Sequence, residues 1–226
     1  MPRKPLKVPA PWSAYLAVAV GLMTVVATSP AGGAEPTRLS EEDYKGHANT
    51  VGIVIVQVNW GRQWKCGAFE NAQLESLSFN GASQWELTTP SRLTAGNSFT
   101  PYALLVPPGK YVLTGYDVKV AMSSSEVIHL RGDETQLVRN GEPLGGVFTI
   151  AAGEVVYIGH IGLDCAREPT PWRYYIESHD EFDRYVAGFR KHFPFLASTP
   201  VMYRLMTTKL FGQDYSIESA PVPQAR

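Results

Sequence analysis

Apolar and polar residues alternate with a period of two over much of the chain, which is the pattern of half-buried β-strands. The alternation is clearest over 110–121, where every second residue from Val112 to Val120 falls on one face. A β-branched run over 51–58 is apolar at both parities and indicates a strand that is buried on both faces. Weaker patterns predict further strands over 84–88, 102–106, 127–130, 147–150, 154–163 and 172–176.

The apolar period lengthens in the last fifth of the chain, where residues three and four positions apart form one face. This pattern predicts a helix over 179–193. Ser178 and Glu181 stand three positions apart at its start, as in a capping box. Pro200 suits a first helical position, so a second helix is predicted over 200–211.

These elements together predict a β-rich α+β protein. Many short strands separated by turn residues indicate an antiparallel β-sandwich, which the two C-terminal helices would close. The predicted domain covers 50–212. The segment 35–49 is polar and has no apolar period, so we expect a flexible lead there, and we expect a loose tail over 213–226.

The first 34 residues have the pattern of a secretory signal peptide. Basic residues at Arg3, Lys4 and Lys7 precede an apolar run over 14–27, and small residues up to Ala34 follow it. An uncleaved anchor is the alternative, but the run of 14 residues is shorter than the roughly 20 that a spanning helix needs. We therefore expect cleavage after Ala34, a periplasmic or secreted protein, and no transmembrane segment in the mature chain.

Charge and cysteine content narrow the class of protein. The 226 residues have a formal net charge of −1, which disfavours a basic surface for nucleic acid. Two cysteines, Cys66 and Cys165, are too few for a four-cysteine zinc site. In an oxidising compartment such a pair most simply forms a disulfide, and the alternative is a reactive thiol, which no Cys-x-x-Cys motif supports.

Two segments resemble a group of bacterial exported proteins and lipoproteins of unknown function. They are Pro108-Gly109-Lys110-Tyr111 and the run from Phe148 to Gly159, which reads FTIAAGEVVYIG. The resemblance implies a small β-sandwich of the carboxypeptidase-regulatory or transthyretin-like kind in the cell envelope, and it implies no catalytic residue. The chain differs from the lipoproteins because it has no cysteine near the signal-peptide junction.

A catalytic centre has little support in the sequence. There is no Gly-x-Ser-x-Gly elbow, no His-Glu-x-x-His motif and no nucleotide-binding fingerprint, and we assign no metal or cofactor. The alternative to a non-catalytic protein is an exported hydrolase with a scattered site near Glu154, His160 and Asp164. His160 and Asp164 share a parity but would lie about 13 Å apart on a regular strand.

Aromatic residues are the remaining candidates for a binding surface. The strand over 172–176 must place aromatic side chains on both of its faces, so Trp172, Tyr174 and Tyr175 form a candidate binding surface. Aromatic core positions are the alternative, and it applies equally to Trp60, Trp64 and Trp85. The sequence thus favours an exported, non-catalytic binding or accessory module whose partner is an envelope protein, a peptide or a glycan.

Overall fold

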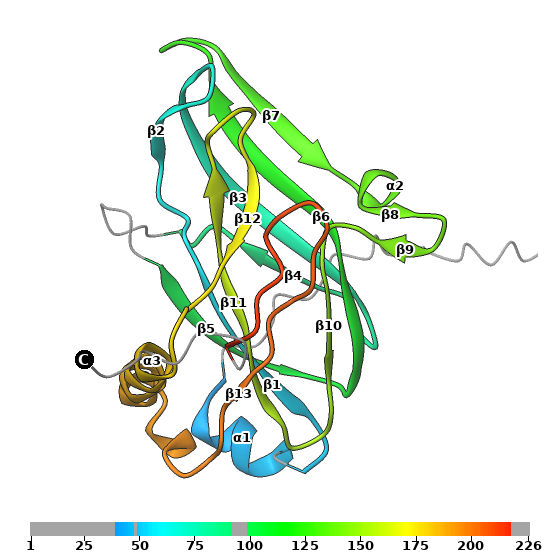
Figure 1. The fold of residues 1–226 in the computed structure, drawn as a ribbon, viewed down its shortest axis with the longest axis vertical. Helices are drawn as coiled ribbons and strands as arrows, with labels where there is room; N and C mark the ends of the chain where they lie inside the picture. The colour runs from blue at the N-terminus through cyan, green and yellow to red at the C-terminus, as the bar shows by residue number, and fades with distance from the viewer. Residues whose placement is uncertain (1–38, 48, 92–98, 218–226) are drawn as a thin grey trace, which may run out of the picture. The chain divides into compact units, whose positions relative to one another are not determined.

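A computed structural model of the chain describes residues 39–47, 49–91 and 99–217. The predicted signal peptide over 1–34 lies outside these residues. The elements are α1 (Glu41–His47), β1 (Gly52–Val58), β2 (Gln63–Cys66), β3 (Phe69–Gly81), β4 (Trp85–Thr88), β5 (Thr100–Val106), β6 (Gly109–Ala121), β7 (Val127–Gly132), α2 (Glu134–Leu137), β8 (Val138–Arg139), β9 (Glu142–Pro143), β10 (Val147–Ile150), β11 (Val155–Asp164), β12 (Thr170–Tyr174), α3 (His179–His192), the 3₁₀ turn η1 (Pro194–Leu196) and β13 (Met202–Tyr203) (Figure 1).

The strands form two main sheets and one small hairpin. The first sheet has the order β12-β11-β1-β5, with β13 also paired to β11. The second has the order β10-β6-β3-β2, with β4 paired to β3 and β7 paired to β6, and β8 and β9 form the hairpin. The β-rich α+β class is confirmed, and most pairs are antiparallel as predicted. The pairs β1–β11 and β11–β13 are parallel, however, so the first sheet is mixed.

Both sheets contribute to one hydrophobic cluster. Val54, Val56 and Val58 of β1 enter it from the first sheet, and Leu74 and Phe79 of β3 enter it from the second. Ile53 and Ile55 of β1 are also buried, on the opposite face of the first sheet. This burial on both sides confirms the prediction made for 51–58. The sandwich arrangement of the two sheets stays a prediction.

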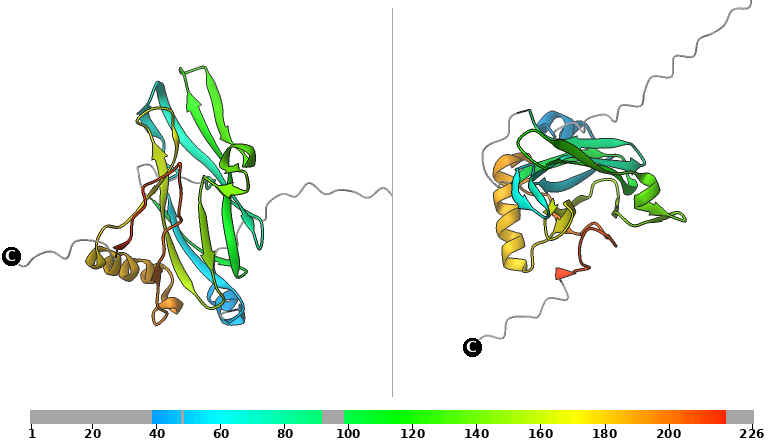
Figure 2. Two further views of the ribbon diagram at one scale, coloured as in Figure 1. Left: turned by 45° about the vertical axis from the view of Figure 1, so that its right-hand side comes forward. Right: turned by 90° about the horizontal axis from the view of Figure 1, so that it is seen from above.

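Helix α3 covers the other face of the first sheet (Figure 2). Its buried residues Phe182, Val186 and Phe189 pack in a second cluster that includes Ile55 and Tyr157 of the sheet. At its start, the Oγ of Ser178 accepts a hydrogen bond from the backbone N–H of Glu181 over 3.3 Å, which satisfies one of the free donors of the first turn. The predicted helix over 179–193 is confirmed.

Strand β3 is not predicted by the simple alternation, although it has 13 residues. A β-bulge explains why, because Leu74 pairs with Val118 and Ser76 with Asp117, which leaves Glu75 as an extra residue. The inward spacing therefore changes from two to three within the strand. The buried residues are Ala72, Leu74, Leu77 and Phe79.

The predicted helix over 200–211 is wrong. The segment instead forms β13, which pairs in parallel with Val156 and Tyr157 of β11. The antiparallel partner β12 pairs with β11 only from His160 onwards. The edge of β11 at Val156 and Tyr157 is therefore free to pair with the segment. Farther along, Thr207 bridges to Val147. The backbone groups find partners in both sheets, and a helix that satisfied them internally is not formed.

The boundaries of the predicted lead and tail also need correction. Residues Glu41–His47 of the expected flexible lead form helix α1. Just before it, Leu39 is buried and its N–H donates to the carbonyl of Ala103 on β5. In the predicted loose tail, Ile217 is buried in the second cluster. Residues 218–226 lie outside the described part of the chain.

The predicted disulfide is present between Cys66 and Cys165, with a Cα–Cα distance of 4.5 Å. Cys66 ends β2 of the second sheet, and Cys165 directly follows β11 of the first. The bond therefore links the two sheets. Among the described residues, no helix is long and apolar enough to cross a membrane.

Candidate functional site

Two residues of the predicted binding surface, Trp172 and Tyr174, share one face of β12, and Tyr175 directly follows the strand. Tyr174 is 40% exposed, and its hydroxyl donates to the carbonyl of Leu163 over 2.8 Å. Tyr175 stacks on Tyr215 of the C-terminal segment, with 4.2 Å between ring centroids. Trp172 is half-buried. The residue between Trp172 and Tyr174 on the strand, Arg173, is 1% exposed.

The three residues of the hydrolase alternative have separate local roles. Glu154 and Asp164 stand at opposite ends of β11, about 33 Å apart at the usual strand rise. Two nitrogens of Arg204 donate to the carboxylate of Glu154, over 2.9 and 3.2 Å, and this pairing lowers the pKa of Glu154. The carboxylate of Asp164 accepts from the N–H of Ala166. The structure therefore does not gather these groups into a catalytic site.

His160 lies in an aromatic environment between β11 and α3. Its ring is 5.3 Å from the ring of Tyr157 and 5.2 Å from that of Tyr185, measured between centroids. Burial lowers the pKa of His160 to about 4, because the charged form loses its hydration. At neutral pH this histidine is uncharged and packed.

The other tryptophans divide between core and surface. Trp60 and Trp85 are buried, so the core interpretation holds for both. Trp64 is 70% exposed. It lies on β2, at the edge of the second sheet, and the guanidinium of Arg62 sits 5.6 Å from the centroid of one of its rings.

The conformation of Lys65 places Trp64 outward. Trp64 and Cys66 have the same parity and would share a face on a regular strand. Lys65 has a φ of 55°, in the left-handed region, and this breaks the alternation. Cys66 therefore turns inward to its disulfide while Trp64 remains on the outer face.

The pairing register of the strands places a row of side chains beside Trp64. Trp64 pairs with Asn71, Asn71 with Ala121, and Ala121 with Val127, so four strands place these residues on one face. The next line on that face has Gln73 opposite Lys119 and Lys119 opposite His129. The third has Asp117 opposite Arg131.

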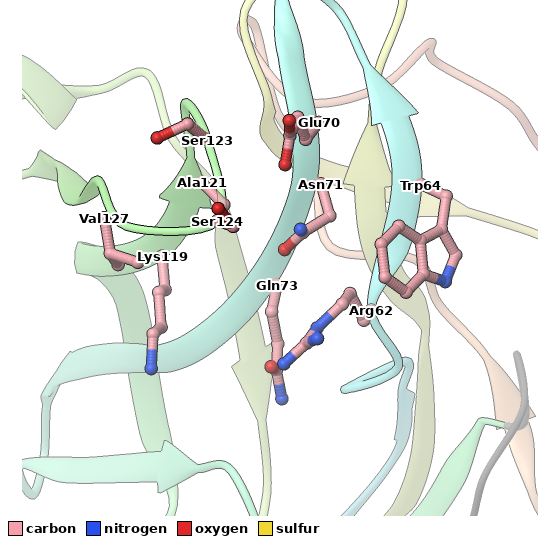
Figure 3. Close-up of a pocket in the computed structure, with 10 residues that line it drawn as sticks. All are labelled: Arg62, Trp64, Glu70, Asn71, Gln73, Lys119, Ala121, Ser123, Ser124 and Val127. Atoms are coloured by element: carbon pink, nitrogen blue, oxygen red, sulfur yellow. The ribbon is translucent and has the colours of Figure 1, made fainter.

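A trough of about 400 Å³ lies over this face. Figure 3 shows Asn71 and Gln73 projecting from β3 between Trp64 and Lys119. We call this hollow the Trp64 trough. The lining residues used below are Arg62, Trp64, Glu70, Asn71, Gln73 and Lys119.

The Trp64 trough combines an exposed aromatic surface with hydrogen-bonding groups of several kinds. Two amides both donate and accept, Glu70 accepts, and Arg62 and Lys119 donate. Its volume falls within the range usual for small-molecule sites. The combination suits a ligand that has an apolar face and many hydroxyl groups.

A second group of side chains borders the trough, and we call it the His129 cluster: Glu75, Asp117 and His129. The three come from β3, β6 and β7. The Nδ1 of His129 lies 2.8 Å from an Asp117 oxygen and 3.7 Å from a Glu75 oxygen. Lys119, which lines the trough, also lies 3.8 Å from Glu75.

Sequence reasoning names Trp64 only as one aromatic residue among several, and it does not identify the polar residues around it. Their common face depends on the register of β3, whose bulge hides the alternation. The apolar residues Ala72, Leu74, Leu77 and Phe79 are spaced by two, three and two positions. This spacing is the signal from which the strand could have been inferred.

Comparison with known proteins gives no matching family model, no matching curated protein and no matching solved structure.

Proposed function

We propose that the protein is an exported, non-catalytic module that binds a glycan in the Trp64 trough. The observation that carries the proposal is Trp64, whose ring is largely exposed at the wall of a trough with polar side chains. A sugar ring offers C–H groups on one face and hydroxyls around its edge, which match an indole surface and neighbouring amide and charged groups.

The side chains that would contact the glycan project from strands that are packed against the core. Asn71 and Gln73 alternate with the buried residues Ala72 and Leu74, so their strand is held by the core. Lys119 alternates likewise with Val118 and Val120 on β6. A site on packed strands loses little conformational entropy when a ligand binds, which favours affinity.

Export is supported by two features of different kinds. The first 34 residues have the pattern of a signal peptide, and the two cysteines form a disulfide, a bond that persists in oxidising compartments. The resemblance to exported β-rich envelope proteins agrees with this. The mass of the protein isolated from its own envelope fraction tests it, and we expect a chain that begins at Glu35.

The test of the binding site compares three proteins on a panel of neutral, acidic and N-acetylated oligosaccharides. We expect the unaltered protein to bind at least one class, with a change in tryptophan fluorescence and a titratable heat. Trp64→Ala should lower that affinity about tenfold or more, since a tryptophan at the centre of a contact commonly dominates it. Because Trp64 is exposed, the variant should keep its thermal stability.

Tyr174→Ala is the matched control, since Tyr174 is an exposed aromatic residue on the other sheet. We expect it to leave glycan affinity unchanged. If Tyr174→Ala abolished binding and Trp64→Ala did not, the site would be on β12. If no oligosaccharide bound but peptides did so through Trp64, the glycan assignment would be wrong.

A further inference from the structure

The side chains of the His129 cluster lie close enough together to hold a ligand in addition to forming ion pairs with one another. Each of its three side chains projects from a different strand of the second sheet, so the sheet itself fixes their separation. One ligand atom of each residue lies within 4.8 Å of the others. This arrangement borders the Trp64 trough, but it does not depend on the proposed glycan binding there.

The two carboxylates each have one oxygen held from outside the cluster. Arg131 Nε donates to Asp117 Oδ2 over 2.8 Å. Lys119 Nζ lies 3.8 Å from Glu75 Oε1. The other two oxygens, Asp117 Oδ1 and Glu75 Oε2, are the ones near His129 Nδ1, at 2.8 and 3.7 Å.

These distances are close to the separations between ligands around a small metal ion. A tetrahedral zinc ion with bonds of about 2.0–2.2 Å holds its ligand atoms about 3.3–3.6 Å apart. The two distances from Nδ1 lie on either side of that range, and each is within about 0.5 Å of it. Outer partners that hold the second carboxylate oxygen are typical of metal sites, and Arg131 and Lys119 are in that position.

We propose that the His129 cluster binds a divalent transition-metal ion of the zinc class through His129 Nδ1, Asp117 Oδ1 and Glu75 Oε2. The imidazole nitrogen selects such ions over calcium and magnesium, which prefer sites made of oxygen ligands alone. Three protein ligands leave a coordination position for water or for a hydroxyl group of a bound molecule.

The neighbouring cations limit the affinity but do not prevent binding. Arg131 is mostly exposed and Lys119 is nearly half exposed, so solvent screens their repulsion of the ion. The ion would lie between His129 Nδ1 and Asp117 Oδ1 and replace their direct contact.

Calorimetric titration of the full chain, without an affinity tag, tests the proposal. The metal-free protein is titrated with zinc chloride at neutral pH, and we expect one ion per chain with a micromolar dissociation constant. His129→Ala should weaken this binding about tenfold or more, since it removes the selective ligand. His179→Ala is the matched control, because His179 is an exposed histidine on α3, outside the second sheet, and it should change nothing.

Asp117→Asn is a second variant, which keeps the proposal testable if His129→Ala fails to fold. It keeps the size of the side chain and removes the charge. It should also weaken zinc binding while the thermal transition remains. Unchanged binding in both variants, or the absence of one-to-one binding, would overturn the proposal. Calcium binding as strong as zinc binding would overturn the assigned metal class. None of these readouts involves a glycan, so failure here and failure of the glycan site are distinguishable.

Discussion

At the scale of single residues, His160 is half-buried among aromatic rings, and its Nε2 atom is buried with no hydrogen-bond partner in the described part of the chain. Among the described residues, the hydroxyls of Tyr157 and Tyr185 are likewise buried and without hydrogen-bond partners. The three polar groups lie in one ring cluster between β11 and α3. The neutral imidazole is tolerated there, and its protonated form is strongly disfavoured.

This environment predicts a loss of stability in acid. The pKa of His160 falls from its usual 6.5 to about 4 in the folded protein, so between these values the unfolded chain binds more protons. Stability should therefore decrease as pH falls from about 6.5 to about 4. At about 1.4 kcal/mol per pKa unit, the loss is at most about 3 kcal/mol, and partial exposure of the ring reduces it.

Urea unfolding at a series of pH values measures this effect. In His160→Leu the acid-side decrease should be smaller by the contribution of His160. His179→Ala, which alters an exposed histidine, should retain the full decrease. If the unaltered protein and His160→Leu had parallel profiles between pH 4 and 7, the burial argument would be wrong.

At the scale of elements, the predictions that hold are those in which local pattern and final environment agree. β1 and α3 each match their predicted period and burial. The segment 200–211 fails because its backbone partners lie on β11 and β10, which are distant in sequence. The parallel pairing of β1 with β11 is also non-local, and no pattern within either strand indicates it.

The candidate site is harder to predict than the fold. Trp60, Trp64 and Trp85 have similar sequence settings, and only the packed structure separates the one exposed ring from the two buried ones. Apart from Arg62, the polar neighbours of Trp64 come from β3 and β6, and each of these strands contains a bulge. At Glu75 and at Thr114 an extra residue reverses which parity faces the core.

The bulge in β3 gives a prediction at this scale. Deletion of Glu75 should be tolerated, because Leu74 would then face inward, Ser76 outward and Leu77 inward in regular alternation. The variant should lose some stability, since the N–H and hydroxyl of Thr89 both donate to the carbonyl of Glu75. It should still show a cooperative thermal transition and a β-type circular dichroism spectrum.

Deletion of Gln73 is the matched control, because it removes a residue from the regularly paired part of the same strand. It moves either Ala72 or Leu74 to the outer face, and we expect an insoluble or unfolded product. Equal behaviour of the two deletion variants would contradict the role assigned to the bulge. The Glu75 deletion also removes one ligand of the proposed metal site, so it should bind zinc more weakly than the unaltered chain.

At the scale of the whole described unit, few covalent or hydrogen-bonded links join the turn after β2 to the end of β11. The disulfide is one, and the N–H of Gly67 donates to the carbonyl of Cys165 over 3.0 Å beside it. Gly67 has a φ of 62°, and a Cβ there would meet the carbonyl oxygen of Arg167 at 1.7 Å. The close approach of the two turns therefore requires glycine at this position.

The disulfide closes a loop with a sequence separation of 99 residues, so its removal should destabilise the protein substantially. The chain-entropy model gives about 4–5 kcal/mol for a loop of this length, and native disulfides commonly contribute about 2–5 kcal/mol. In the double variant Cys66→Ala, Cys165→Ala, the urea midpoint should decrease accordingly. Reduction of the unaltered protein should have the same effect, and Ser125→Ala, a change in an exposed loop, should have none.

The same double variant separates global stability from the local order of β2. Trp64 lies two residues from Cys66, on an edge strand that pairs with β3 alone among the described strands. Without the disulfide we expect faster amide exchange in β2 than in the central strand β6, together with weaker glycan binding under conditions where the rest of the protein is folded. Uniform exchange across both strands would show that the disulfide stabilises only the whole unit and does not specifically position Trp64.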